Sequence, residues 1–274
     1  MSGLPRIHAV TDDRVVAAAG IVRRAAAMAD AIGPDLAVQL RSRALGGAAL
    51  LGLARELASV LAPRGSWLIV NDRADVARAG GAAAVVSGRG GLSVEDIRKA
   101  APGLLAIRSV HDRDEAQRAA AEGADALIAG HVFETPTHAG EPPRGVEVVR
   151  QAAATGRPVI AIGGLTSRRI AQVLEAGAVA IAAIRALWDA PDPGAASREL
   201  LAQFDPPGTV GLIINGEPHR VRRGSLLDVL AALGLDPRAV VVEHNRRIVR
   251  RDALAATTVA EGDTVELVHF VGGG

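Results

Sequence analysis

Val159-Ile160-Ala161-Ile162-Gly163-Gly164-Leu165-Thr166 is a short apolar run that ends at two glycines, and it begins a unit that repeats along the chain. Ser167–Ala176 follows with apolar residues at helical spacing, and Val179–Ile184 is a second apolar, β-branched run. Parallel strands need a long crossover between them, which is usually a helix. The order of strand, helix and strand therefore predicts a parallel sheet.

The same alternation of apolar runs and alanine-rich amphipathic stretches extends through residues 1–205. Helical patterns such as Asp114–Glu122 and Val146–Thr155 separate the runs. The eight strand candidates are Arg6–Val10, Leu36–Arg41, Trp67–Asn71, Ala83–Val86, Leu104–Ser109, Ala126–Ala129, Val159–Ile162 and Val179–Ile184. Eight such units predict an α/β fold of the (β/α)8 TIM-barrel type, with a doubly wound sheet as the alternative.

The composition excludes several classes of protein. The 274 residues are 49% hydrophobic and include 31 Lys and Arg against 30 Asp and Glu, so no strong field points to nucleic acid or a membrane surface. Aromatic residues make up 2%, too few for a base-stacking surface, and the absence of Cys excludes thiolate chemistry. The sequence shows neither a long apolar span nor a signal pattern. We expect a soluble cytoplasmic protein, and a homo-oligomer is compatible with the sequence.

The pattern changes at Asp205-Pro206-Pro207-Gly208-Thr209, whose composition is typical of a linker. The Asn215-Gly216 pair beyond it is a strong hairpin signal. The later strand candidates are Val210–Asn215, Arg220–Arg222, Val240–Asn245, Arg247–Arg250 and Thr264–Phe270, and a helix capped by Ser225 covers Leu226–Leu233. Residues 209–274 are therefore predicted to form a second, small α+β domain.

The chain ends on Gly272-Gly273-Gly274, directly after the last strand candidate. Glycine loses more entropy on ordering than any other residue and buries no side chain, so such a tail adds nothing to a fold. Its thin backbone can instead thread a narrow channel and present a terminal carboxylate to an enzyme. A frayed terminus is the alternative.

The small domain resembles a known family. Ile214-Asn215-Gly216-Glu217, Val242-Glu243-His244-Asn245 and Glu261–Gly273 resemble ThiS, the ubiquitin-like (β-grasp) sulfur carrier of thiamin thiazole biosynthesis. The small subunit of molybdopterin synthase is a similar carrier, but its sequence motifs resemble this chain less than those of ThiS do. The resemblance implies that a ThiF-like adenylyltransferase and a sulfur donor system convert the end of the chain, Gly273-Gly274, to a thiocarboxylate. It also implies a ThiG-like thiazole synthase as the partner that takes the sulfur.

Polar residues gather where the barrel strands would end, which is where TIM barrels carry their function. Arg41 and Arg43 alternate, so we expect both on one strand and one face, with solvated surface arginines as the alternative. Gly163-Gly164 before a helix would leave backbone N–H groups for a phosphate, or would form a tight turn. The remaining polar strand ends are Asn71, Asp72, Ser109, His111 and His131.

The barrel also resembles a family. The similarity rests on His8–Asp13, Gln39–Arg43, Asn71–Arg73, Arg108–His111, Gly130–Thr135 and Ala161–Gly164. These runs resemble the thiamin phosphate synthase superfamily, and more closely its TenI branch, the thiazole tautomerases. Both branches are phosphate-binding barrels, so the branch depends on individual residues.

Those residues weaken the synthase alternative. The synthase pattern has Lys where Arg43 and His138 stand, and an acidic Mg²⁺ ligand in the loop after the fourth strand. That loop reads Ser87-Gly88-Arg89-Gly90-Gly91-Leu92-Ser93, without a carboxylate. Asp72 remains as a single metal ligand, which holds Mg²⁺ poorly without help.

The tautomerase resemblance implies an isomerase that moves a proton on a thiazole carboxylate phosphate and gives the aromatic tautomer. His131 is the expected proton-transfer group, because imidazole titrates near neutral pH. Arg41 or Arg43 would bind the substrate carboxylate. Further expected substrate contacts are Asn71, Ser109, His111, Thr135 and Thr137, and the expected phosphate contacts are Gly163, Gly164, Ile184 and Arg185.

Two alternatives stay open. A thiamin phosphate synthase would join a pyrimidine pyrophosphate to a thiazole phosphate and would use Mg²⁺. A barrel without activity would serve as a scaffold for the carrier. The tautomerase itself requires no cofactor and no metal.

Overall fold

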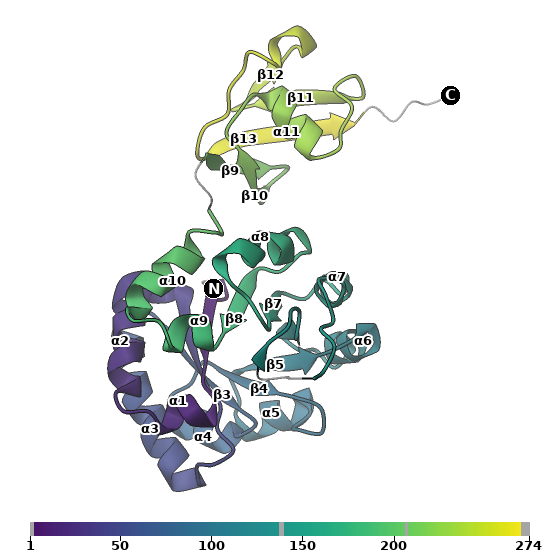
Figure 1. Ribbon diagram of the computed structural model, residues 1–274. Helices are drawn as coiled ribbons and strands as arrows, with labels where there is room; N and C mark the ends of the chain where they lie inside the picture. Colours follow the sequence, from purple (N-terminus) through teal and green to yellow (C-terminus); the bar gives the residue numbers. More distant parts are fainter. Residues whose placement is uncertain (1–2, 137–139, 206–207, 270–274) are drawn as a thin grey trace. The chain divides into compact units, whose positions relative to one another are not determined.

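The computed structural model describes residues 3–136, 140–205 and 208–269 (Figure 1). The chain divides into two compact units, Met1–Phe204 and Asp205–Gly274. Each unit has its own hydrophobic core. No helix within the described ranges is long and apolar enough to cross a membrane.

The first unit is a closed barrel of eight parallel strands, as the sequence predicts. Neighbours in the chain pair around the ring, and Ile7 closes it by pairing with Leu36 on one side and Ile181 on the other. The strands are β1 (Ile7–Val10), β2 (Leu36–Leu40), β3 (Trp67–Asn71), β4 (Ala84–Ser87), β5 (Leu105–Val110), β6 (Ala126–Gly130), β7 (Val159–Ile162) and β8 (Ala180–Ala183).

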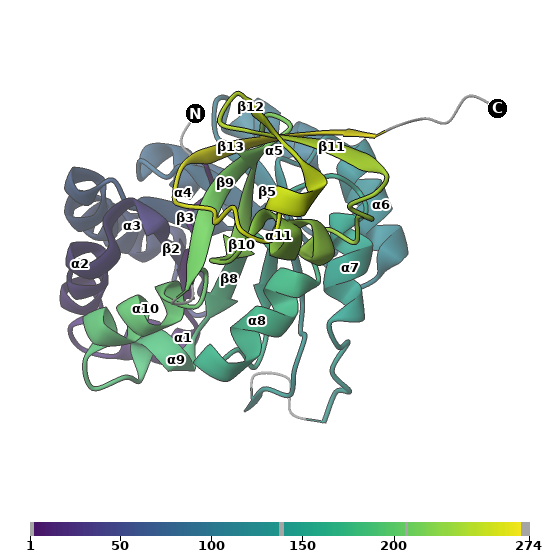
Figure 2. The ribbon, with the colours of Figure 1, turned by 90° about the horizontal axis from the view of Figure 1, so that it is seen from above.

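Helices surround the strands on the outside of the barrel (Figures 1 and 2). Local chemistry sets where several of them begin: Ser93 and Asp96 form a capping box, and the Asp112 carboxylate accepts from Glu115 N–H. The helices are α1 (Asp13–Ala17), α2 (Ile21–Ile32), α3 (Gly47–Leu61), α4 (Ala74–Ala79), α5 (Val94–Ala100), α6 (Arg113–Ala121), α7 (Glu147–Ala153), α8 (Ser167–Glu175), α9 (Arg185–Trp188) and α10 (Pro193–Leu201). Short 3₁₀ segments, η1 (Gly33–Asp35) and η2 (Ala62–Arg64), follow α2 and α3.

Alternate residues of each strand fill the barrel interior. On β3 and β5 these are Ile69 and Ile107, which pack with small residues such as Ala37 and Ala126. His8 is also fully buried; burial lowers its pKa to about 4, against a hydrogen bond to the Pro5 carbonyl that acts the other way. The interior is therefore packed, and ligand chemistry is left to the ends of the strands.

One expectation about β2 is wrong. The strand ends at Leu40, so Arg41 and Arg43 lie in the following loop and do not alternate on one strand. The cause is two side chains of the β1–α1 region. Thr11 Oγ1 donates to the Arg41 carbonyl and accepts from its N–H, both at 2.8 Å, and Asp13 accepts from Arg43 N–H at 2.8 Å. These side chains take the backbone groups that a longer strand would have paired.

The second unit is a five-stranded sheet in the order β10-β9-β13-β11-β12. The pair β9–β13 is parallel and the other pairs are antiparallel. Its elements are β9 (Thr209–Ile214), β10 (Glu217–Arg222), α11 (Leu226–Ala232), β11 (Val240–His244), β12 (Arg247–Val249), η4 (Arg251–Ala253) and β13 (Asp263–His269). Helix α11 packs on one face through Leu226, Val229 and Leu230 (Figure 2). This is the predicted β-grasp fold.

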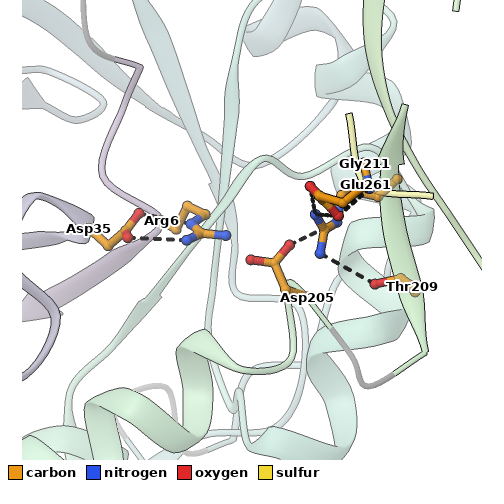
Figure 3. A network of polar contacts seen from close by, with 7 residues as sticks. Arg6, Asp35, Asp205, Thr209, Gly211 and Glu261 are labelled. Atoms are coloured by element: carbon orange, nitrogen blue, oxygen red, sulfur yellow. Dashed lines mark hydrogen bonds and ion pairs between the residues drawn. The ribbon is translucent and has the colours of Figure 1, made fainter. Parts of the chain in front are cut away.

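Polar contacts secure the first hairpin of this sheet (Figure 3). Arg220 Nε lies 3.0 Å from Asp205 Oδ1, and its Nη1 lies 3.3 Å from Glu261 Oε1. Glu261 also accepts from the Gly211 N–H at 2.8 Å. At the turn, Asn215 and Gly216 have φ of 51° and 83°, which suits the two-residue hairpin predicted from the sequence. The other ion pair in the view, Arg6 with Asp35 at 2.8 Å, belongs to the barrel.

Candidate active site at the barrel rim

Two amide side chains, of buried Gln39 and half-buried Asn71, meet at the carboxyl ends of β2 and β3. Gln39 Nε2 donates to Asn71 Oδ1 at 2.6 Å, and Gln39 is 3% exposed. Gln39 Oε1 is buried and has no hydrogen-bond partner within the described parts of the chain. An unsatisfied buried carbonyl is costly, so this oxygen is suited to an N–H donor on a ligand. Gln39 is not among the site residues predicted from the sequence, although it lies two residues before Arg41 in the same motif.

Two arginines follow in the loop after β2. The Arg41 backbone is fixed by Thr11, as described above, and the residue is half-buried, whereas Arg43 is exposed. Within the described ranges, neither guanidinium forms an ion pair. The Asp13 carboxylate serves the loop backbone instead: hydrogen bonds from Ser42 Oγ and from backbone N–H groups lower the pKa of Asp13. Both guanidinium groups are therefore available to an anionic ligand.

A single carboxylate, Asp72, stands between the loops after β3 and β4. Its backbone φ is 58°, and its N–H donates to the Val86 carbonyl at 2.8 Å. A Cβ placed on Gly91 would lie 3.1 Å from Asp72 Oδ1. The described residues contain no group of three or more His, Cys, Asp or Glu that could hold a metal ion. The donor set for Mg²⁺ is thus one carboxylate, and these residues do not form a metal site by themselves.

His111 is held at the start of α6 by Glu115. The Glu115 carboxylate accepts from the His111 N–H at 2.8 Å, contacts His111 Nδ1 at 2.9 Å and pairs with Arg89. Burial alone raises the pKa of Glu115, but these hydrogen bonds outweigh it and hold the value at about 2. Ser109 lies two residues earlier on β5, on the same face as the inward Ile107. Glu115 thus fixes His111 beside Asp112, the N-cap residue of α6, and the expected contact of His111 with a substrate stays a prediction.

The loops after β6 and β7 are packed against each other through glycine. Gly163 and Gly164 have φ of 106° and 63°, values that residues with a side chain rarely adopt. A Cβ on Gly163 would lie 2.5 Å from the His131 Cβ, and one on Gly164 would lie 2.4 Å from the Glu134 carbonyl oxygen. His131 itself is 6% exposed. The two glycines are therefore required by packing as well as by backbone conformation.

This close packing leaves backbone donors at the rim. No acceptor in the described ranges takes a hydrogen bond from the N–H groups of Gly164, Ile184 or Arg185. Helix α9 begins at Arg185, and Trp188 N–H returns to the Ile184 carbonyl at 2.9 Å. N–H groups of this kind are suited to phosphate. Thr135 lies in the neighbouring loop, while the expected contacts Thr137, Gly273 and Gly274 lie outside the described residues.

The rim thus has two parts. The side-chain half comprises residues at the ends of β2, β3 and β5 and in the loops that follow them: Gln39, Arg41, Arg43, Asn71, Asp72, Ser109 and His111. The backbone half comprises Gly163, Gly164, Ile184 and Arg185, after β7 and β8, with His131 packed on Gly163. Fold and rim define a (β/α)8-barrel protein with cationic side chains and free backbone N–H groups at the carboxyl ends of its strands, within the described residues.

The chain belongs to the family described as thiamine monophosphate synthase, which matches residues 7–187. Residues 212–274 match the ThiS family. The protein is therefore a barrel of the TMP-TENI family fused to a ThiS-like domain, and both parts point to thiamine biosynthesis.

Individual relatives agree with this assignment. A thiamine-phosphate synthase of Thermus thermophilus is 40% identical over 165 residues, which cover 60% of this chain and 80% of the relative. One of Methanoregula boonei is 41% identical over 167 residues, covering 60% and 77%. The solved thiamine phosphate pyrophosphorylase of Pyrococcus furiosus has a TM-score of 0.65 at 28% identity and covers 73% of this chain and 96% of that structure.

The expected isomerase class is wrong. The relatives are named thiamine-phosphate synthases, which are transferases and not tautomerases. The tautomerase assignment rested on Arg43 and on the run around His131, whereas the similarity to the synthases extends over most of the barrel. A few rim residues were given too much weight against the whole domain.

Proposed function

We propose that the barrel is a transferase of the thiamine-phosphate synthase type, which joins a pyrimidine pyrophosphate to a thiazole phosphate. The thiazole ring nitrogen would attack the methylene carbon of the pyrimidine. A C–N bond forms, the C–O bond breaks, and its electron pair leaves with pyrophosphate. The observation that carries the proposal is the 40% identity to a named synthase over 80% of that protein's length.

The rim offers a role for each part of the two substrates. The N–H groups of Gly164, Ile184 and Arg185 would bind the thiazole phosphate. The Gln39 Oε1 atom, buried without a partner within the described ranges, would accept an N–H of the pyrimidine. The guanidinium groups of Arg41 and Arg43 would stabilise the negative charge that grows on the leaving pyrophosphate, because charge-assisted pairs with phosphate are strong.

A barrel without transferase activity is the second candidate. The observation that favours it is the lone carboxylate Asp72, since the synthase pattern has a second acidic residue in the loop after β4. In this case the barrel would bind a thiazole phosphate and serve as a scaffold for the carrier. No step of the proposed reaction is assigned to a metal ion.

One experiment separates the two candidates. The full chain is incubated with both substrates, with and without Mg²⁺, and thiamin phosphate and pyrophosphate are quantified by mass spectrometry. The transferase proposal is supported if the wild-type chain forms thiamin phosphate and pyrophosphate in equal amounts and the Gln39→Met variant forms much less of both. Calorimetric binding of thiazole phosphate without any product would instead support the scaffold.

We also propose that the C-terminal domain carries sulfur as a thiocarboxylate on Gly274. The match to the ThiS family supports this, and β13 leads directly toward the terminus. A ThiF-like adenylyltransferase, a sulfur donor system and a ThiG-like thiazole synthase would be its partners. Intact mass after incubation with an activating enzyme and a sulfur source should show replacement of one oxygen by sulfur. An equal gain after deletion of Gly273-Gly274 would contradict the assignment.

A further inference from the structure

The loop after β4 places a glycine where a second carboxylate would face Asp72. A Cβ on Gly91 would lie 3.1 Å from Asp72 Oδ1 and 2.5 Å from Ser87 Oγ. Gly91 does not have a positive φ, so its backbone conformation is open to other residues. The loop from Ser87 to Ser93 contains no acidic side chain. This loop therefore places no second carboxylate beside Asp72.

The other polar groups of this loop are used to close it. Ser87 Oγ donates to the Leu92 carbonyl at 2.8 Å and accepts from Arg108 Nη1 at 3.2 Å, and Arg108 also donates to the Leu92 carbonyl. Gly91 N–H donates to the Gly88 carbonyl at 3.1 Å. Arg89 is paired with Glu115. Within the described residues, Ser87 Oγ both donates and accepts a hydrogen bond and Arg89 is paired with Glu115, whereas Arg108 Nε is buried without a hydrogen-bond partner.

Positive charge lies on the loop after β2, in Arg41 and Arg43. Arg41 and Arg43 form no ion pair in the parts of the chain that the structure describes. Mg²⁺ needs near-octahedral oxygen coordination and is usually held by one or two carboxylates with substrate phosphates. An Arg guanidinium can neutralise phosphate oxygens directly through paired N–H donors. The rim thus offers two arginine forks, while Asp72 carries one carboxylate and the Asp13 carboxylate is hydrogen-bonded to the backbone of the loop after β2.

We propose that this rim binds a phosphorylated ligand without a divalent cation, with Arg41 and Arg43 supplying the positive charge. Gly91 is the position at which the barrel departs from a two-carboxylate metal site. The inference rests on the proposed function for the class of ligand, a pyrophosphate ester. It adds that the charge of the ligand is balanced by side chains and that an acidic residue at position 91, with the Ser87 hydroxyl removed, would create a metal site.

The first test measures binding of inorganic pyrophosphate to the full chain by calorimetry, in EDTA and in excess Mg²⁺. We expect binding in EDTA at least as tight as with Mg²⁺, and a loss of about tenfold or more in Arg41→Gln/Arg43→Gln. Arg78→Gln is the matched control, because Arg78 is an exposed arginine near the end of α4 and away from the rim. Wild-type binding that disappears in EDTA would overturn the proposal.

The second test introduces a second carboxylate that could coordinate a metal ion together with Asp72. Gly91→Asp is made together with Ser87→Ala, which removes the hydroxyl that a Cβ would strike, and Gly91→Asn/Ser87→Ala is the uncharged control. Mn²⁺ binding, followed by electron paramagnetic resonance, should appear in the Asp variant and be absent from the Asn variant and wild type. Tight Mn²⁺ binding by wild type would contradict the inference, and thermal melting checks that both variants fold.

These measurements do not depend on turnover. If pyrophosphate binds without metal but no thiamin phosphate forms under any condition, the transferase proposal fails and the inference about charge stands. If product forms only with Mg²⁺ and binding also needs Mg²⁺, the inference fails and the transferase proposal stands.

Discussion

The two halves of the rim present different chemical groups, although both lie on one ring of parallel strands. The side-chain half presents amides at the ends of β2 and β3, and guanidinium groups and the Asp72 carboxylate from the loops that follow these two strands. The backbone half presents N–H groups from the loops after β7 and β8, fixed by glycines that pack on the loop after β6. Side-chain recognition can change by one substitution, whereas backbone recognition is tied to the stability of the barrel. Substitutions in the two halves should therefore have different effects.

The largest effect is expected for Gly163→Ala in the backbone half. The new Cβ would lie 2.5 Å from the His131 Cβ at a φ of 106°. Strained backbone and overpacking each cost about 1–3 kcal/mol, so the free energy of unfolding should fall by about 2–6 kcal/mol. Urea unfolding followed by circular dichroism measures this loss.

Gly88→Ala in the loop after β4 is the matched control. A Cβ there meets nothing within 4 Å, and the φ of Gly88 is not positive. Its free energy of unfolding should stay within about 0.5 kcal/mol of wild type. Equal losses in the two variants would show that the glycines of the backbone half have no special packing role.

Glu115→Gln should have the next largest effect, because it removes the charge that holds His111 and Arg89. We expect a loss of about 1–3 kcal/mol in the free energy of unfolding at neutral pH. The pKa of Glu115 is about 2 in the folded chain, below its ordinary value of 4.5. Its contribution is therefore complete above pH 4.5 and is lost as the pH falls toward 2.

Unfolding measured between pH 7 and pH 3 checks this sign. The difference between wild type and Glu115→Gln should shrink as the pH falls. A difference that stays constant or grows toward acid would contradict the role of this carboxylate. The comparison with Gly163→Ala, whose effect should not follow the titration of Glu115, separates electrostatic from packing effects.

Most of the fold could be predicted from the sequence, because short apolar runs and helical spacing are local signals. Val159–Ile162 and Trp67–Asn71 end where the sequence predicts. The end of β2 could not be predicted, since it depends on contacts from Thr11 and Asp13, about 30 residues away in the chain. Long-range side-chain contacts decide where this strand stops.

The site was predicted less completely. Gly163 and Gly164 were expected at the rim, but their fit against His131 and Glu134 needs the packed loops. Gln39 was missed because a buried, partly unsatisfied amide has no signature in a single sequence. The class of reaction was also wrong, since it depended on a few side chains and not on the barrel as a whole.

Gln39→Met should weaken ligand binding more than it changes the stability of the barrel. The variant removes the buried oxygen that has no partner in the described ranges, and it also removes the donor to Asn71. These changes oppose each other, so the free energy of unfolding should change by less than about 1 kcal/mol. Calorimetric affinity for the pyrimidine pyrophosphate should fall about tenfold, as expected for one lost hydrogen bond. Unchanged affinity would remove Gln39 from the site.

The smallest effect is expected for Arg185→Ala, and it tests the comparison most directly. Arg185 is exposed, and its expected contact with the thiazole phosphate is through the backbone N–H at the start of α9. Because alanine keeps that N–H and is a good helix former, the affinity for thiazole phosphate should change by less than about twofold. Arg41→Ala should weaken pyrophosphate binding much more, since there the guanidinium is the proposed contact. Losses of similar size at Arg185 and Arg41 would mean that the two halves bind anions alike, through side-chain charge.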